Sequence, residues 1–327
     1  MELQKACARA IVIGGCLTIG SVMAQDLKAY PIKSVRMVVP FPPGGGTDIL
    51  ARMISQRLSE IWGQQVIVEN RAGAATNIGT EFVARSAPDG HTMLMASVGH
   101  GANISLYKKL GYHPVKSFEM VTLVAVSPSL LVVTPALPIK SVKELVVLAR
   151  KRPGDLNYGS FGRGTSPHLA AELFNILASV KMTHVPYKGS SPALTSVMSG
   201  ETQVLFGTIL ASRPLVESGR LRALGVASKH RLSILPDLPT IGESLKDFES
   251  GSWYGIVVPS GTPVIIVEKI NRDATSVLRQ PEVKNRFTSE GAEIVASTPG
   301  DFKVYLQAEI DRWERVVRET GLQSEVP

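Results

Sequence analysis

One stretch near the start of the chain combines a strand pattern, a stiff loop and a helix pattern. Residues Val35–Val39 are mostly β-branched, which is typical of a strand. In the next segment, 40–48, three prolines restrict the backbone angle φ, and three consecutive glycines allow conformations that other residues avoid. From Ile49 to Trp62, apolar residues recur at helical spacing. We therefore predict a strand, a rigid loop and a helix, in that order.

The loop between this strand and helix has the character of an anion-binding site. A glycine-rich turn that leads into a helix exposes backbone N–H groups, and the helix dipole places partial positive charge at the same end. Thr47 or Asp48 is positioned to cap the helix. Many α/β proteins use glycine in such turns, but three glycines behind two prolines exceed what a tight turn needs. We interpret the loop from Phe41 to Asp48 as one wall of a ligand site.

Strand and helix patterns alternate through most of the remaining chain. The expected strands are 65–70, 92–96, 123–126, 130–133, 156–159, 204–207, 221–226 and 253–259, and the segment 183–189 is expected to be a strand and the turn that follows it. The expected helices are 78–86, 141–151, 167–177, 191–199, 264–278, 281–290 and 299–319, the last with one apolar stripe that packs on a sheet. This alternation predicts an α/β protein built from parallel βαβ units. Ligands bind at the carboxyl ends of such strands, so the loops 40–48, 71–77 and 97–102 are expected to converge.

Length and charge narrow the class of protein. A chain of 327 residues suggests about two domains. The formal net charge is +7, but the basic residues are scattered and aromatic residues make up only 6%. A nucleic-acid surface needs a basic stripe, so no nucleic-acid partner is predicted.

The first 24 residues have the pattern that is typical of a secretory signal peptide. A basic start with Lys5 and Arg9 precedes a short apolar run and a small-residue exit that ends at Ala24. Both cysteines, Cys7 and Cys16, lie in this segment, so the mature chain is expected to contain none, which excludes disulfides and thiol catalysis. Lipidation at Cys16 is the alternative, although the glycines before it fit a lipoprotein signal poorly. The pattern predicts an exported protein with its leader removed.

Motifs for catalysis or cofactor binding do not stand out. The sequence carries no nucleophile elbow, zinc-protease motif, P-loop or EF-hand pattern, and the glycines 159, 162 and 164 have the wrong spacing for a dinucleotide site. The six histidines share no ligand spacing, so we predict no metal and no cofactor. His168 follows the expected helix start at Ser166, where it either points at an anion or bonds locally. His184 lies in an apolar strand and reads as a core histidine.

Several motifs, in order along the chain, resemble one known family. From Asp26 to about Gly321 the sequence is similar to the substrate-binding proteins of tripartite tricarboxylate transporters, the Bug-type periplasmic receptors. The motifs that carry the resemblance are Tyr30-Pro31-x-Lys33-x-Val35-Arg36, Pro40-Phe41-x-Pro43-Gly44-Gly45-x-Thr47-Asp48, Val68-Glu69-Asn70-Arg71, Asn77-Ile78-Gly79, Ala87-Pro88-Asp89-Gly90, Val185-Pro186-Tyr187-Lys188-Gly189, Trp253-Tyr254-Gly255 and Pro259-x-Gly261-Thr262-Pro263.

The resemblance implies a two-lobed periplasmic-binding-protein fold of the Venus flytrap type. Each lobe would be a mainly parallel sheet flanked by helices, with lobe 1 at 26–124 plus 251–327 and lobe 2 at 125–250. Such a protein is a monomer without catalytic residues that captures a small carboxylate between its lobes and delivers it to a membrane permease. A secreted α/β enzyme acting on a carboxylate or ester, with His168 as base and a loop serine as nucleophile, is the alternative. It lacks an acid to orient the histidine.

The resemblance also implies a set of ligand-binding residues and leaves the ligand open. The set is Phe41, Pro43, Gly44, Gly45, Gly46, Thr47, Asp48, Asn77, Ser97, Ser160, Gly162, Gly164, Thr165, His168, Tyr187, Lys188 and Gly189. Three departures from the family pattern bear on the ligand. The segment 73–76 replaces a usual Gly-Ala-Gly-Gly, His91 replaces a usual Tyr, and Gly207-Thr208 stands where an Asp or Asn often follows the strand. We expect the last departure to remove a polar contact in lobe 2.

Overall fold

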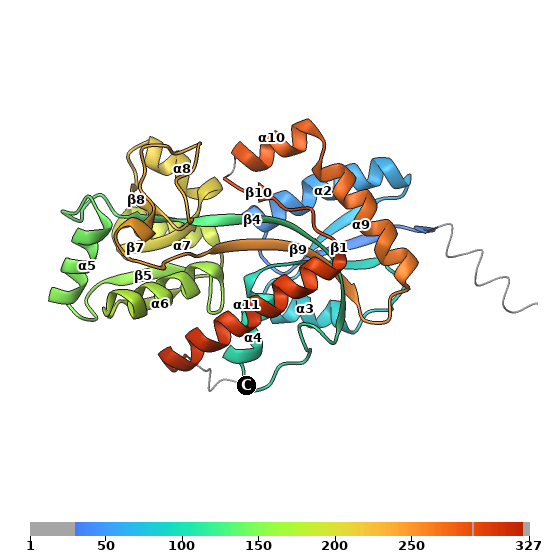
Figure 1. Cartoon of the computed structure of the whole chain (residues 1–327), viewed down its shortest axis with the longest axis horizontal. Coiled ribbons are helices and arrows are strands. Elements are labelled where there is room, and N and C mark those ends of the chain that lie inside the picture. Colours follow the sequence, from blue (N-terminus) through green and yellow to red (C-terminus); the bar gives the residue numbers. More distant parts are fainter. Residues whose placement is uncertain (1–29, 290, 323–327) are drawn as a thin grey trace, which may run out of the picture.

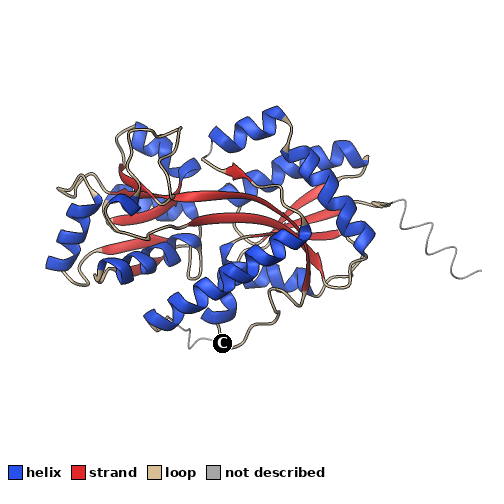
Figure 2. Ribbon diagram, in the orientation of Figure 1, coloured by secondary structure: helices blue, strands red, loops and turns tan. Residues whose placement is uncertain are grey.

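The computed structural model describes residues 30–289 and 291–322 and forms two lobes joined by two long strands (Figure 1). The expected signal peptide, with Cys7 and Cys16, lies outside the described residues. Helices cover both faces of the sheet in each lobe, which confirms the predicted α/β class (Figure 2). No helix within these described ranges is long and apolar enough to cross a membrane.

The first lobe contains the strands that the opening sequence motif predicted. β1 (Val35–Val39) pairs in parallel with β2 (Val66–Asn70) on one side and with β3 (Thr92–Ala96) on the other. β9 (Gly251–Pro259) pairs antiparallel with β3, and the short β10 (Glu293–Ile294) pairs antiparallel with β4. Its helices are α2 (Gly46–Trp62), α3 (Asn77–Ala84) preceded by η2 (Ala74–Thr76), α4 (Val98–Leu106), α9 (Val264–Leu278), α10 (Pro281–Ser289) and α11 (Pro299–Thr320).

The second lobe repeats the pattern with fewer residues. β5 (Asn157–Ser160) pairs in parallel with β6 (Thr183–Pro186) and with β7 (Val204–Thr208). β8 (Arg222–Val226) pairs antiparallel with β4. Its helices are α5 (Val142–Lys151), α6 (Ser166–Ala178), α7 (Ser190–Ser199) and α8 (Ile209–Glu217), with η3 (Ile241–Glu243) near the return to the first lobe.

Two strands run side by side across both lobes (Figure 1). β4 (Phe118–Val133) has 16 residues and changes partners along its length: Phe118–Pro128 pairs with β9, whereas Ser129–Val133 pairs with β7. The prediction of two separate strands at 123–126 and 130–133 was wrong. Polar Ser127 and Ser129 interrupt the apolar pattern, but they lie where one strand crosses between two sheets.

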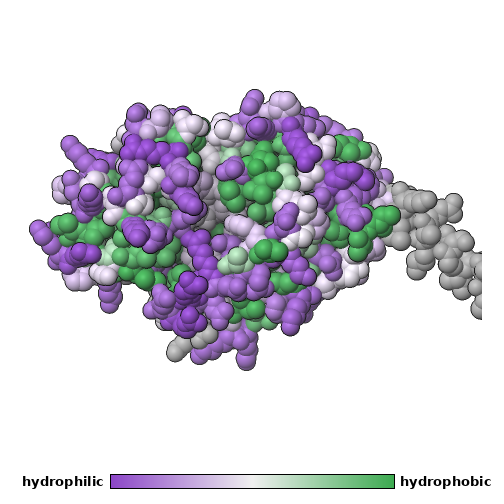
Figure 3. Space-filling model, in the orientation of Figure 1, coloured by the Kyte–Doolittle hydropathy of each residue, from purple (hydrophilic) through white to green (hydrophobic). Residues whose placement is uncertain are grey.

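The last helix packs as the predicted strap. α11 lies against α4 and β4, and its stripe of Phe302, Leu306 and Trp313 is buried. Gly255 on β9 makes room for it, because a Cβ atom there would lie 2.2 Å from Phe302 Cζ. Hydrophilic side chains cover most of the face shown in Figure 3, with apolar patches between them.

Three further differences from the sequence prediction concern local structure. The segment 97–102, expected as a loop, is mostly the start of α4, because Ala102 and Leu106 pack into the core beneath α11. α8 and β10 were not predicted, and both are short elements whose position depends on contacts with distant parts of the chain.

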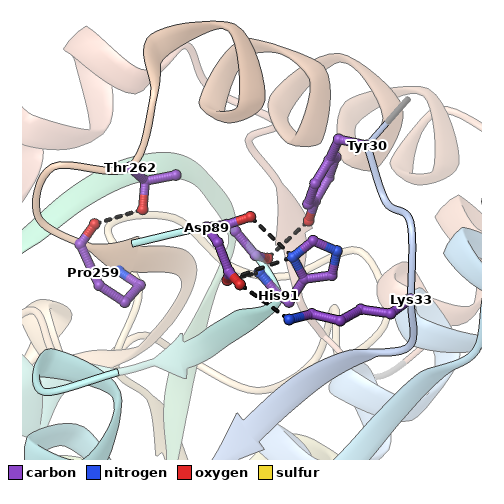
Figure 4. A network of polar contacts seen from close by, with 7 residues as sticks. Tyr30, Lys33, Asp89, His91, Pro259 and Thr262 are labelled. Atoms are coloured by element: carbon purple, nitrogen blue, oxygen red, sulfur yellow. Dashed lines mark hydrogen bonds and ion pairs between the residues drawn. The ribbon is translucent and has the colours of Figure 1, made fainter. Parts of the chain in front are cut away.

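The first described residues are anchored to the body of lobe 1 (Figure 4). The Tyr30 hydroxyl donates to the Gly90 carbonyl at 2.8 Å, and its ring packs edge-on against Trp62. Asp89 accepts from Lys33 Nζ at 3.2 Å and from the His91 amide at 2.9 Å. These contacts fix the start of β1, and therefore the direction in which the loop after β1 leaves the sheet.

Candidate functional site

A cavity of about 310 Å³ lies between the lobes, and we call it the interlobe cavity. Lobe 1 contributes the loop after β1 and the start of α4, and lobe 2 contributes the loops that precede α6, α7 and α8. β9 supplies Ser252 and Tyr254. The full lining is Phe41, Pro42, Pro43, Gly45, Gly46, Thr47, Ser97, Phe161, Thr165, Ser166, Pro167, Lys188, Gly189, Ser190, Ser191, Pro192, Thr208, Ser252 and Tyr254.

Five helices begin at this cavity. The residues that precede the first turns of α2, α4, α6, α7 and α8 all belong to its lining, and none of them caps its helix with a side-chain hydrogen bond. These N-cap residues are Gly45, Ser97, Thr165, Gly189 and Thr208. The first N–H groups of a helix have no partner within the helix. Backbone donors from both lobes are thus left for whatever occupies the cavity.

Of the helices that begin elsewhere, α5 and α11 are capped by side chains, whereas α3 and α9 are not. Ser141 caps α5 by accepting from the Glu144 amide at 3.2 Å, and Thr298 caps α11 by accepting from the Asp301 amide at 3.1 Å. Glu144 and Asp301 also place negative charge in those first turns. The five helices at the cavity have no acidic residue in the first turn except Asp48 in α2. Their dipoles therefore add positive potential that nothing in most of these turns offsets.

Asp48 stabilises the loop and does not cap the helix. It is 2% exposed, and its carboxylate accepts from the Gly44 amide at 2.9 Å, Arg52 Nε at 3.0 Å and Asn70 Nδ2 at 2.8 Å. Burial raises the pKa of Asp48, but the hydrogen bonds from Arg52, Gly44 and Asn70 outweigh it and hold this pKa below its usual value. The N-cap is Gly45, so the expectation that Thr47 or Asp48 caps the helix was wrong.

Lys188 is the charged residue of the lining. Its side chain is exposed, and its ammonium pairs with no other described residue. Thr208 adds a hydroxyl: its Oγ1 is buried and has no hydrogen-bond partner in the described part of the chain. We expected Gly207-Thr208 to remove a polar contact from lobe 2, but Thr208 places a hydroxyl group without a hydrogen-bond partner in the cavity wall.

The two lobes touch around the cavity. A Cβ atom on Gly189 would lie 3.5 Å from Pro42 Cγ, and a Cβ atom on Gly45 would lie 3.8 Å from Ser190 Oγ. Gly189 has a φ of 107°, in the left-handed region that glycine tolerates best. Below the cavity, a Cβ atom on Gly164 would lie 2.6 Å from Asn103 Oδ1. Close approaches between residues of opposite lobes show that the cleft is closed in this structure.

His168 and His184 stack beneath the loop that precedes α6, with ring centroids 4.1 Å apart. His168 Nδ1 accepts from the Gly164 amide at 3.1 Å. Of the two predicted roles for His168, contact with an anion or a local hydrogen bond, the structure shows the local hydrogen bond. His184 Nε2 lies 2.6 Å from Ser160 Oγ. Burial lowers the pKa of both histidines, that of His184 to about 4, and the charge of Arg163 acts in the same direction. Both rings are therefore neutral near pH 7.

The predicted site residues fall into two groups. Those that line the cavity are Phe41, Pro43, Gly45, Gly46, Thr47, Ser97, Thr165, Lys188 and Gly189. Those that lie outside its lining are Gly44, Asp48, Asn77, Ser160, Gly162, Gly164, His168 and Tyr187. Ligand contact by any of them stays a prediction.

The loop 71–77 does not reach the cavity, although we expected three loops to converge there. Asn77 Oδ1 instead accepts from Asn103 Nδ2 at 2.7 Å and from the Tyr112 hydroxyl at 3.0 Å, which braces α4 from below. Sequence reasoning missed Ser190, Ser191 and Pro192, which directly follow Gly189 and form a helix-start pattern that could have revealed them. It also missed Ser252 and Tyr254, although Tyr254 belongs to the motif Trp253-Tyr254-Gly255.

The close pair of Ser160 and His184 does not form a catalytic site. Ser160 is fully buried, its hydroxyl donates to the Gly162 carbonyl at 3.1 Å, and neither residue lines the cavity. Among the described residues, no group of three or more His, Cys, Asp or Glu side chains is placed to hold a metal ion.

Comparison of the sequence and of the structure with known proteins points to one family of receptors. Residues 50–322 match the family model described as tripartite tricarboxylate transporter family receptor. A solved structure described as R. palustris Rpa4515 with adipate is 39% identical, with a TM-score of 0.86 over 89% of this chain and 98% of that one. MatC from Rhodopseudomonas palustris with bound malate is 35% identical, with a TM-score of 0.83 over 88% and 100%. The periplasmic binding protein BugD is 32% identical, with a TM-score of 0.84 over 90% and 99%.

Proposed function

Because the chain belongs to the tripartite tricarboxylate transporter receptor family, we propose that it is a periplasmic solute-binding protein that captures a small carboxylate in the interlobe cavity. The observation that carries this proposal is the meeting of five helix N-termini without side-chain caps. A carboxylate accepts several N–H bonds at once and is favoured by the positive ends of helix dipoles.

The ligand class follows from the size and chemistry of the cavity. Its volume, about 310 Å³, suits a short molecule, and apolar Phe41, Phe161 and Tyr254 can cover a hydrocarbon middle part. Donors lie on both lobes, so a molecule with a carboxylate at each end can satisfy both walls. The similar proteins solved with adipate and with malate support short dicarboxylates as the class to test.

The delivery route is the second part of the proposal. A receptor of this family hands its ligand to membrane permease subunits, and we propose that the chain acts as a monomer after its leader is removed on export. Members of the family work in the periplasm. The proposed lobes are 26–124 plus 251–327 and 125–250, with β4 and β9 as the hinge about which they open and close.

Binding without conversion distinguishes this receptor from the alternative carboxylate-processing enzyme. Purified periplasmic protein is titrated with adipate and with malate in a calorimeter, and the solution is then analysed by mass spectrometry. We expect saturable binding of at least one dicarboxylate, with a Kd on the order of micromolar, and recovery of the ligand unchanged. Turnover of a bound carboxylate would instead support the enzyme.

A further inference from the structure

A second cavity, of about 660 Å³, lies at the hinge strands, and we call it the hinge cavity. It is lined by Val126, Ser127, Pro128, 227–233, 249–253, Gly291, Glu293, Tyr305, Glu309 and Arg312. Trp253 lines it, whereas the next residue, Tyr254, lines the interlobe cavity. Successive side chains of a strand point to opposite faces, so β9 runs between the two cavities, and its Ser252 belongs to the lining of both.

The hinge cavity has walls from both lobes. Lobe 2 contributes the segment 227–233 that follows β8, and lobe 1 contributes Tyr305 and Arg312 of α11 together with Glu293 of β10. The floor is the crossing region of β4 and β9, where β4 changes partners. A rotation of the lobes about these strands must therefore change the width of this cavity.

Charges of both signs are left unpaired in its lining. Arg231 is paired with Glu243 at 2.7 Å and Arg312 with Glu309 at 3.5 Å. The ammonium of Lys229 and the carboxylates of Glu249 and Glu293, in contrast, pair with no other charged group in the described ranges. One cavity thus offers a free cation on the lobe 2 side and free carboxylates by the start of β9 and on β10.

Buried polar atoms of the floor are also unsatisfied. Ser250 is 3% exposed and Trp253 is 1% exposed, and neither Ser250 Oγ nor Trp253 Nε1 has a hydrogen-bond partner in the described part of the chain. A buried polar group without a partner is costly and uncommon in native structures, so such groups call for an explanation. The indole N–H can only donate, and it therefore needs an acceptor.

We propose that the hinge cavity binds a zwitterionic molecule of the amino-acid class. Its carboxylate lies toward Lys229, its ammonium toward Glu249 and Glu293, and its apolar part against the ring of Tyr305, which packs on the buried Trp253. An occupant touches both lobes on the side of the hinge opposite the carboxylate, so its binding is coupled to closure of the interlobe cavity. By thermodynamic linkage, each ligand then changes the affinity of the other by the same factor.

The direct test uses four probes that differ only in charge. L-norleucine and 6-aminohexanoate are zwitterions with close and distant charges, and hexanoate and hexylamine each lack one of the two charges. Each is added up to about 10 mM to protein free of dicarboxylate, and binding is followed by calorimetry and tryptophan fluorescence. We expect saturable binding of at least one zwitterion, a fluorescence change that Trp253→Phe removes, and affinities at least about tenfold weaker for the singly charged probes.

Charge variants locate the binding to this cavity. Lys229→Gln and Glu293→Gln are each expected to weaken zwitterion binding about tenfold, while Lys246→Gln, an exposed lysine of the same lobe outside the cavity, leaves it unchanged. Failure of both zwitterions to bind, or equal binding of hexanoate and the zwitterions, overturns the proposal. These titrations need no dicarboxylate, so their failure is separate from failure of the proposed receptor function.

Discussion

Trp253 and Tyr254 are neighbours on β9, yet their side chains belong to two different cavities. Tyr254 faces the enclosed space in which five helices begin, and Trp253 faces the mixed-charge space at the hinge. The strand that carries both pairs with β4 across the crossing point between the lobes. We propose that ligand capture and lobe rotation are connected through these two adjacent residues of one strand.

The first prediction concerns Gly189. Gly189→Val is expected to lower dicarboxylate affinity at least about tenfold, because the side chain enters the cavity wall against Pro42 and penalises the positive φ of the residue. Gly200→Val is the matched control: it lies at the other end of α7, has a φ of 82° and faces open space. Both variants should lose similar stability in thermal unfolding, but only the first should lose affinity in calorimetry.

Lys188 is expected to contribute much less than the backbone. Its ammonium is exposed, where water and salt screen it, so Lys188→Gln should weaken dicarboxylate binding only about threefold. Raising the salt concentration should have a similarly small effect on the affinity of the unmodified protein. Lys181→Gln, exposed on the same lobe but outside the cavity, serves as control. A hundredfold loss in the Lys188 variant would mean that a side-chain charge dominates recognition.

Thr208 should show opposite effects on stability and binding. Thr208→Val removes a buried hydroxyl that has no partner, so the free protein should become more stable by about 1 kcal/mol while dicarboxylate affinity falls severalfold. Thr202→Val is the control: its hydroxyl lies outside the cavity and is hydrogen-bonded to Ser196 Oγ at a distance of 2.8 Å. That variant should lose stability and keep its affinity. Denaturant unfolding and calorimetry of both variants decide the question.

Acid is expected to destabilise the protein through buried histidines. Burial lowers the pKa of His100 to about 4, outweighing its hydrogen bond to the Pro114 carbonyl, and the unfolded chain restores the usual value of 6.5. Unfolding therefore takes up a proton between pH 6.5 and 4. The contribution of His100 to the free energy of unfolding is fully present above pH 6.5 and declines as the pH falls. Below pH 4 the loss for this residue reaches about 3 kcal/mol.

His100→Gln provides the check on that pH dependence. Its free energy of unfolding, measured by denaturant titration from pH 7 to pH 4, should fall less steeply than that of the unmodified protein. The variant is expected to start from lower stability at pH 7, because the ring packs against Tyr112 and Phe118. Parallel curves for the two proteins would show that His100 does not titrate in this way.

The sequence made much of this fold predictable for local reasons. The β1–loop–α2 unit, the second α/β module and the apolar stripe of α11 each rest on a pattern within one segment. The continuous β4 and the α4 helix were missed because contacts with β9 and α11 decide their structure, against the local pattern. The family resemblance supplied the two-lobed arrangement that these patterns alone left open.

The site was predictable only in part, because its donors are mainly backbone groups. Phe41 and Gly45 stood out as members of an unusual loop, Lys188 came from the family resemblance, and all three line the cavity. An N–H group has no residue type of its own, so a helix start such as that of α8 gives no chemical signal in the sequence. Ser252 and Tyr254 reach the cavity from a strand that enters it more than 200 residues after the β1 loop, and no spacing rule connects the two.

Amide NMR can show whether backbone N–H groups at the helix starts hold a carboxylate. Protein labelled with ¹⁵N is titrated with the dicarboxylate that binds in calorimetry. We predict that the largest shifts, and the strongest slowing of hydrogen exchange, occur in the first-turn amides of α2, α6 and α7. Saturable dicarboxylate binding that leaves these amides unchanged would contradict it.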